Sequence, residues 1–114
     1  MTNNIERLYN LAKVPKFWNY DKEIFEYRII FDEKRQLNII KLLCSSEDFF
    51  LDLNGEIPKF TDVFLWTISV EWYSKSKGYK NIQKDFPQAL AGLVCELWED
   101  LTDEQKAEIK RILE

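Results

Sequence analysis

The chain has 114 residues and a net charge of −4 at pH 7, and 46% of its residues are hydrophobic and 15% aromatic. This length suits one domain, and this apolar content excludes an intrinsically disordered chain. Because the sequence has neither a stretch of about 20 apolar residues nor a basic-then-apolar signal pattern, we expect a single globular domain, residues 1–114, in the cytoplasm.

The first predicted element is a short helix over residues 3–12. Asn3 can cap its N-terminus, an apolar stripe at helical spacing follows, and Pro15 stops the helix. The connector at 16–21 contains three large rings, which is typical of a segment that lies over the core. Alternating apolar and polar residues then predict a strand over 25–31.

The next elements are predicted from a cap and a turn signal. Asp32 offers an N-cap for a helix over 33–45, whose apolar positions recur at helical spacing. A short strand is expected at 49–53. The dipeptide Asn54-Gly55 after it predicts a hairpin turn of type I′, because both central positions of that turn need positive φ.

The clearest strand pattern covers residues 64–72, where large apolar residues alternate with polar ones. The alternative is a helix over residues 62–75, which would scatter the rings of this segment around its circumference. The polar stretch 74–84, which contains Gly78, predicts a turn or loop.

The C-terminal third predicts a helical hairpin. Pro87 suits the first turn of a helix, and apolar residues recur at helical spacing as far as Leu101. Small residues, Gly92 among them, allow another element to approach this helix closely. Thr102 and Gln105 have the spacing of a capping box that starts a second helix.

Together these elements predict a small α+β domain. It has N-terminal helices, two or three short antiparallel strands with an aromatic core face, and a C-terminal helical hairpin packed on the sheet. The alternative is a mostly α fold in which residues 62–75 are helical.

Residue types that support catalysis or metal binding are scarce. The chain has no histidine, which excludes Ser-His-Asp and Cys-His nucleophiles and the common zinc motifs. Cys44 and Cys95 lie in predicted helices, and we expect both to be small buried hydrophobes. The three glycines are isolated, so the sequence has no glycine-rich phosphate-binding loop. We expect no enzymatic activity, no catalytic or metal-binding residues and no cofactor.

Parts of the sequence resemble small uncharacterised proteins encoded by phages and prophages of Gram-positive bacteria. Residues 90–105 and 109–113 resemble the endings of those proteins, and residues 4–12 and 33–37 are also similar. The resemblance lies in helix caps and core positions. It implies an accessory phage protein in the cytoplasm of a bacterial host cell, and no activity or functional residue carries over from it.

Two charged segments are candidate interaction surfaces. An acidic surface can engage a basic groove on a partner protein, and lysines interleaved with rings can hold single-stranded nucleic acid. The first segment, the acidic rim, consists of Glu96, Glu99, Asp100, Asp103 and Glu104. The second, the basic-aromatic patch, consists of Tyr73, Lys75, Lys77, Tyr79, Lys80 and Lys84. The alternative for each segment, which we favour, is a solvated face without a partner.

The leading hypothesis from sequence is a non-enzymatic phage or prophage accessory protein that acts by contact with a host or phage protein. Its specific version is an inhibitor of a host defence or regulatory protein that uses the acidic rim. The alternative is a small nucleic-acid-binding regulator that uses Lys75 to Lys84, although the net negative charge argues against nucleic acid. A homo-oligomer is a third option, and no membrane partner is expected. Whether Trp18 and Trp72 are core or interface residues stays open.

Overall fold

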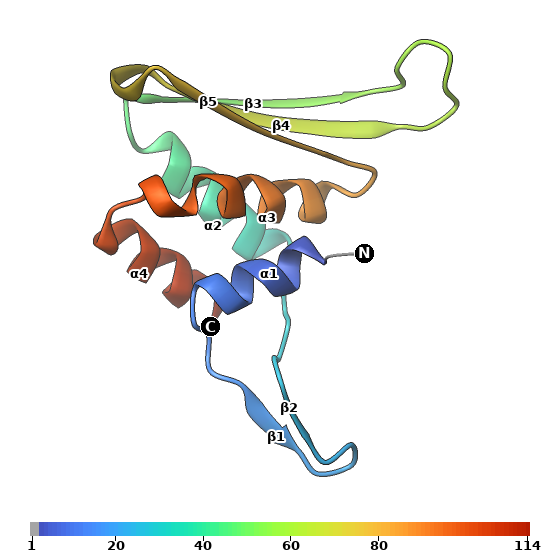
Figure 1. The fold of residues 1–114 in the computed structure, drawn as a ribbon, viewed down its shortest axis with the longest axis vertical. Coiled ribbons are helices and arrows are strands. Elements are labelled where there is room, and N and C mark those ends of the chain that lie inside the picture. The colour runs from blue at the N-terminus through green and yellow to red at the C-terminus, as the bar shows by residue number, and fades with distance from the viewer. Residues whose placement is uncertain (1–2) are drawn as a thin grey trace.

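The structure is a computed structural model that describes residues 3–114, and it confirms the predicted α+β class (Figure 1). A two-stranded and a three-stranded antiparallel sheet are combined with helices. The elements are, in chain order, α1 (Asn4–Leu11), β1 (Phe17–Asn19), β2 (Ile24–Glu26), α2 (Glu33–Cys44), β3 (Phe49–Glu56), β4 (Leu65–Trp72), the 3-10 turn η1 (Tyr73–Lys75), β5 (Lys77–Gln83), α3 (Phe86–Leu97), the 3-10 turn η2 (Trp98–Asp100) and α4 (Asp103–Leu113).

Helix α3 is the centre of the molecule. Pro87 lies in its first turn, as the sequence predicts, and eight of its 12 residues are buried. The helix packs against β4 and β5 of the sheet and against α1 on its other side (Figure 1). A helix that is apolar around its whole circumference is stable only when it is enclosed in this way.

The sheet has the strand order β3-β4-β5, and the helices lie on one of its faces (Figure 1). Ile68, Val70 and Trp72 of β4 are buried on the helix side. Phe49 of β3 pairs with Trp72, and their ring centroids are 4.5 Å apart. The predicted strand at 64–72 is therefore confirmed, and the alternative of a helix over 62–75 is wrong.

The predicted hairpin turn at Asn54-Gly55 is wrong. Both residues lie within β3, where they pair with Thr67 and Trp66, and the chain turns in the loop over residues 57–64. Gly55 has no positive φ. Instead, a Cβ on Gly55 would lie 2.6 Å from Cζ of Phe64, so the glycine makes room for a ring.

The predicted loop over 74–84 is also wrong for most of its length. Only η1 and Ser76, whose φ is 49°, form the turn, and β5 then pairs with β4 over seven residues. Tyr79, Asn81 and Gln83 are less exposed than the residues between them. The residues of β5 thus alternate between less and more exposed positions, as expected of a strand. Most of them are polar, so a pattern of hydrophobicity does not reveal this alternation.

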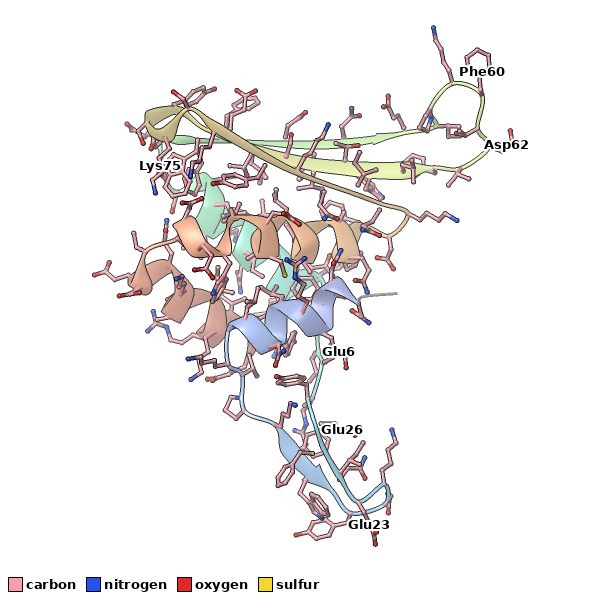
Figure 2. The ribbon with its side chains drawn as sticks, in the orientation of Figure 1. Glu6, Glu23, Glu26, Phe60, Asp62 and Lys75 are labelled. Atoms are coloured by element: carbon pink, nitrogen blue, oxygen red, sulfur yellow. The ribbon has the colours of Figure 1, made fainter. Side chains whose placement is uncertain are left out.

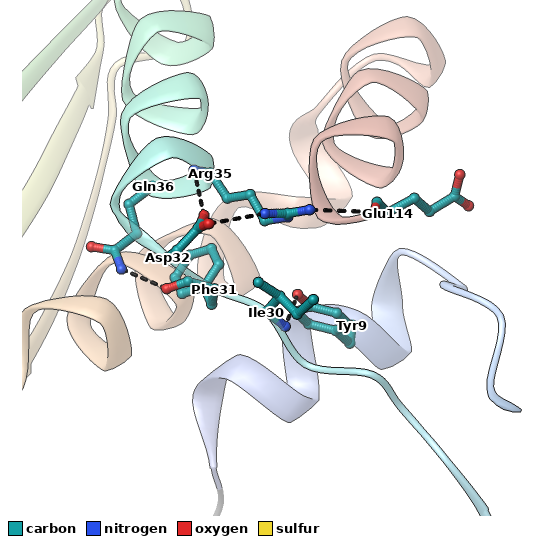
Figure 3. A network of polar contacts seen from close by, with 7 residues as sticks. All are labelled: Tyr9, Ile30, Phe31, Asp32, Arg35, Gln36 and Glu114. Carbon is teal, nitrogen blue, oxygen red and sulfur yellow. Dashed lines mark hydrogen bonds and ion pairs between the residues drawn. The ribbon is translucent and has the colours of Figure 1, made fainter.

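The strand predicted over 25–31 is shorter in the structure, because β2 ends at Glu26. Between β2 and α2, the backbone is not paired with another strand, and hydrogen bonds with side chains hold it in place. Ile30 donates its backbone N–H to the hydroxyl oxygen of Tyr9, at 3.2 Å. Figure 3 shows this contact beside the ion pair of Asp32 with Arg35, at 3.1 Å. Arg35 also donates to the backbone oxygen of Glu114, at 3.5 Å, and so links α2 to α4.

The predicted capping box at the start of α4 is confirmed. Gln105 donates its backbone N–H to Oγ1 of Thr102, and Thr102 donates its own to Oε1 of Gln105, at 3.1 and 2.9 Å. Of the two C-terminal helices, α3 packs on the sheet, whereas α4 packs against α2. The longest helices of the described chain have 12 residues, and none is long and apolar enough to cross a membrane.

Two hairpins project from this body in different directions (Figure 1). One is the β1–β2 hairpin, residues 17–26, and the other is the end of the β3–β4 hairpin, whose loop over residues 57–64 we call the β3–β4 tip. The radius of gyration of the Cα atoms is 15.2 Å, compared with roughly 13 Å for a compact chain of this length. The projections therefore expose side chains that a compact shape would cover.

Candidate interaction surfaces

The acidic rim and the basic-aromatic patch meet at Asp100. Oδ1 of Asp100 lies 3.7 Å from Nζ of Lys75 and 3.6 Å from Nζ of Lys77. Tyr79 donates its hydroxyl hydrogen to Oδ2 of the same carboxylate. These contacts fasten η2 to the start of β5. The two surfaces proposed as rivals from the sequence thus lie side by side and neutralise one another in part.

The contact at Asp100 shifts the pKa of both its main partners. The hydrogen bond from Tyr79 lowers the pKa of the Asp100 carboxyl below its ordinary value, and Lys77 and Lys75 lower it further. In turn, the hydrogen bond to Asp100 raises the pKa of Tyr79 to about 12, because a phenolate would face a carboxylate. Both groups are therefore in fixed charge states at neutral pH, which suits a structural contact.

The rest of the acidic rim is divided between pairing and solvent. Oε1 of Glu96 lies 3.7 Å from Nη1 of Arg7 on α1. Glu99 is exposed. Asp103 and Glu104 are exposed in the first turn of α4, where carboxylates stabilise the helix dipole. The rim is therefore not a uniform block of free negative charge.

The basic-aromatic patch is distributed over two faces of the sheet. Lys80 follows Tyr79 in β5 and pairs with Ser69, so its side chain leaves the face opposite to that of Tyr79. Tyr73 and Lys84 are exposed at opposite ends of β5. Four lysines on one face would make a phosphate-binding surface, but this arrangement does not gather them.

The turn between β4 and β5 is held by Asp48. Its Oδ2 accepts a hydrogen bond from Nε1 of Trp72 at 2.6 Å, and its Oδ1 accepts one from the backbone N–H of Ser74 at 2.9 Å. The hydroxyl of Ser74 also donates to this carboxylate. The hydrogen bonds from Ser74 lower the pKa of Asp48, and that from Trp72 adds to the effect. Trp72 is therefore a core residue, and the one polar atom of its side chain has a hydrogen-bond partner.

The two cysteines differ in the structure. Cys95 is buried as predicted, and burial raises the pKa of its thiol to about 11. Cys44 is exposed, so the prediction that it is buried is wrong. The buried stripe of α2 contains Ile39 and Leu43, and the next residue along a helix points about 100° away from such a stripe. Among residues 3–114, no group of His, Cys, Asp or Glu side chains could hold a metal ion.

The described surface also has hollows, and one of those between α2 and α4 is lined by several cations. It has a volume of about 340 Å³, and Arg35 and Arg111 line it. Arg111 pairs with Glu108, however, and Arg35 pairs with Asp32. Because acids within the chain already compensate these cations, the hollow is not a strong anion-binding site.

Large apolar side chains are exposed at the β3–β4 tip, which the sequence analysis did not single out. Phe60 is fully exposed and has a φ of 67°, in the left-handed region. Figure 2 shows it at the end of the hairpin, pointing away from the body. Thr61 closes the turn by donating its backbone N–H and its hydroxyl to the carbonyl oxygen of Pro58, at 3.3 and 2.9 Å. Ile57 and Phe64 beside it are also exposed.

A second exposed cluster lies on the β1–β2 hairpin. The ring centroid of Trp18 is 4.9 Å from that of Phe25 and 6.4 Å from that of Tyr20, with edge-to-face geometry. Phe17 and Ile24 lie on the opposite face, where the guanidinium of Arg28 is 5.5 Å from the Phe17 ring. Trp18 is thus a surface residue, in contrast to the buried Trp72.

Comparison of the chain with models of known protein families, with curated proteins and with solved structures found no match.

Proposed function

We propose that this chain is a non-enzymatic protein that acts by binding another protein through the β3–β4 tip. One observation carries the proposal. The tip presents Phe60 fully to solvent, in a backbone conformation that side chains rarely adopt.

The conformation of Phe60 is costly for the isolated chain. The left-handed region costs a residue with a side chain about 1–2 kcal/mol, and a ring in water forgoes the stabilisation of burial. Strain of this kind tends to persist where function requires it. A ring held at the end of a hairpin can enter a pocket on a partner, and aromatic residues dominate the energetics of many interfaces.

The surroundings of Phe60 indicate the chemistry of its partner. Ile57, Val63 and Phe64 are exposed around it and can exclude water from a contact. Within the tip, Asp62 and Lys59 cancel, and Glu56 at the end of β3 adds one negative charge beside it. The best match is an apolar pocket with a positively charged border. A host defence or regulatory protein, encountered by a phage accessory protein, is the partner class that the sequence resemblance suggests.

The other candidate surfaces receive less support. Asp100 and Glu96 of the acidic rim already pair with cations of the same chain. Lys75 and Lys77 of the basic-aromatic patch are two of those cations, so a nucleic acid would have to compete with Asp100 for them. The acidic rim is therefore at most a secondary contact in this proposal.

A capture experiment with matched variants tests this proposal. The full chain would be immobilised, and proteins bound from a lysate of a Gram-positive bacterium would be identified by mass spectrometry. The captured protein, once purified, should bind Phe60→Ser at least about tenfold more weakly than the wild type, since burial of a ring contributes about that much to affinity. Phe50→Ser is the control, because Phe50 is exposed on β3 but lies away from the tip.

Two results would contradict the proposal. One is a partner that binds Phe60→Ser as tightly as the wild type but loses affinity when Glu99, Asp103 and Glu104 are changed to lysine. The other is tight binding of single- or double-stranded DNA, with a steep salt dependence in fluorescence polarisation.

A further inference from the structure

The β1–β2 hairpin is a separate projection that lacks a covering layer. Its strands have three residues each and make their main contacts with each other. A two-stranded hairpin is at best marginally stable in water unless a further strand or an apolar layer covers it. One face of the hairpin is formed by the rings of Trp18, Tyr20 and Phe25, so this is the face that a cover would occupy.

The exposed area of this face is close to what a small dimer interface needs. The exposed fractions are 38% for Trp18, 84% for Tyr20 and 65% for Phe25. With about 150–250 Å² for each aromatic side chain, they expose roughly 300–450 Å² per copy. Two copies packed face to face would bury roughly 600–900 Å² from these residues, and flanking side chains and backbone would bring the total to the roughly 1,000 Å² that a biological interface has at the least.

The charges of the hairpin favour a second copy as the occupant. Three cations and three carboxylates lie between residues 16 and 28, and Lys22 pairs with Glu26 at 3.6 Å. A surface with a large net charge repels a copy of itself, whereas a surface with balanced charges can pack against its copy without net repulsion. The segment 96–114, by contrast, has a net charge of −4 and would repel a second copy of itself.

A lipid surface fits this hairpin less well. Figure 2 shows Glu23 at the end of the hairpin, and Asp21 lies in the same turn. These carboxylates would enter the interface ahead of the rings, where the anionic lipids of a bacterial membrane would repel them.

We infer that a second copy of this chain covers the hairpin. In this two-fold symmetric dimer, Trp18, Tyr20 and Phe25 of one copy pack against the same residues of the other. Such an interface is isologous, so it closes on itself and does not propagate into a filament. The inference is independent of the proposed function, because it uses the other hairpin and leaves the β3–β4 tip free.

The test is the mass of the full chain in solution, measured by sedimentation velocity over a range of concentrations. We expect a reversible dimer with twice the 13.7 kDa of one chain. Phe25→Ser should raise the dissociation constant at least about tenfold, because each dimer loses two buried rings. Ile24→Ser is the matched control, since this neighbour in β2 faces the other side. It should change the constant much less.

Circular dichroism would confirm that both variants remain folded, which is expected because both residues are exposed. A wild-type chain that stays monomeric up to millimolar concentration would overturn the inference. So would a dimer that Phe25→Ser leaves intact and Phe60→Ser disrupts, or a monomer that sediments with phosphatidylglycerol vesicles through these rings.

Discussion

At the scale of single residues, Gly92 lies at the point of α3 where side chains of both α1 and β5 come close to its backbone. A Cβ on Gly92 would lie 2.5 Å from Cγ of Asn81 and 2.6 Å from Nδ2 of Asn4. Asn4 is buried, and it donates through this nitrogen to the backbone oxygen of Gln88 at 3.1 Å. The small residues of α3 therefore allow close approach, as the sequence suggests, and the approaching side chains are polar.

We expect Gly92→Ala to lower the free energy of unfolding by about 1–2 kcal/mol. Overpacking costs about 1–3 kcal/mol, and the higher helix propensity of Ala regains up to about 1 kcal/mol. Urea denaturation would measure the difference. Gly78→Ala is the control, because a Cβ there would lie 4.0 Å from its nearest neighbour, the backbone oxygen of Val70. Equal stability of wild type and Gly92→Ala would show that the asparagines can move aside.

The two thiols should react differently. We expect one thiol per folded chain to react rapidly with Ellman's reagent at mildly alkaline pH, because Cys44 is exposed whereas Cys95 is buried with a pKa raised to about 11. Cys44→Ser should remove the rapid reaction, and denaturant should release the second thiol. Rapid reaction of both thiols in the folded chain would contradict the packing of α1 against α3.

Phe60 should lower the stability of the folded chain while it increases the affinity for the partner. Asn adopts positive φ more easily than Phe does, so we expect Phe60→Asn to raise the free energy of unfolding by about 1 kcal/mol. The same change removes the ring from the proposed interface and should abolish capture of the partner. Thermal and urea unfolding would measure the first effect. A loss of stability would mean that the tip is held by packing of the ring and is not strained.

At the scale of elements, the contact between Tyr79 of β5 and Asp100 of η2 makes stability depend on pH. The pKa of Tyr79 is about 12 in the folded chain, compared with 10.0 for a free tyrosine. A raised pKa means that this contribution is fully present below pH 10.0 and is lost as the pH rises towards 12. We expect the free energy of unfolding of the wild type to fall over this interval more steeply than that of Tyr79→Phe. Parallel curves would contradict the assignment.

The helices of this chain could be predicted because their signals are local. The side chain of Asn3 accepts hydrogen bonds from the backbone of Ile5 and Glu6, and that of Asp32 accepts one from Arg35. Such caps involve residues only two or three positions apart, so the sequence contains all of the information. Strand β5 is different, because its polar residues are ordered by pairing with β4 and no local signal distinguishes them from a loop.

At the scale of the whole molecule, the β3–β4 tip should be separable from the fold. Glu56 pairs with Leu65 at the end of the hairpin, so residues 57–64 can be replaced by Asn-Gly, which suits a two-residue turn. We expect the free energy of unfolding to change by less than about 1 kcal/mol, since a shorter loop costs less entropy and surface residues contribute little. Urea denaturation of this variant is the check. Unfolding would show that the tip supports the body, whereas a stable variant without partner binding fits the proposal.

The sequence by itself determined the α+β class, the N-terminal caps of α1, α2 and α4, the strand at 64–72 and the scarcity of catalytic residue types, whereas α3 ends at Leu97, before the predicted end at Leu101. These properties depend on neighbours in the chain or on composition, and both can be read directly. The tertiary structure decided which charged surfaces stay free, because Asp100 meets Lys75 and Lys77 only after β5 pairs with β4. It also decided that Phe60 and the Trp18 cluster project into solvent, since exposure depends on which distant elements cover a side chain.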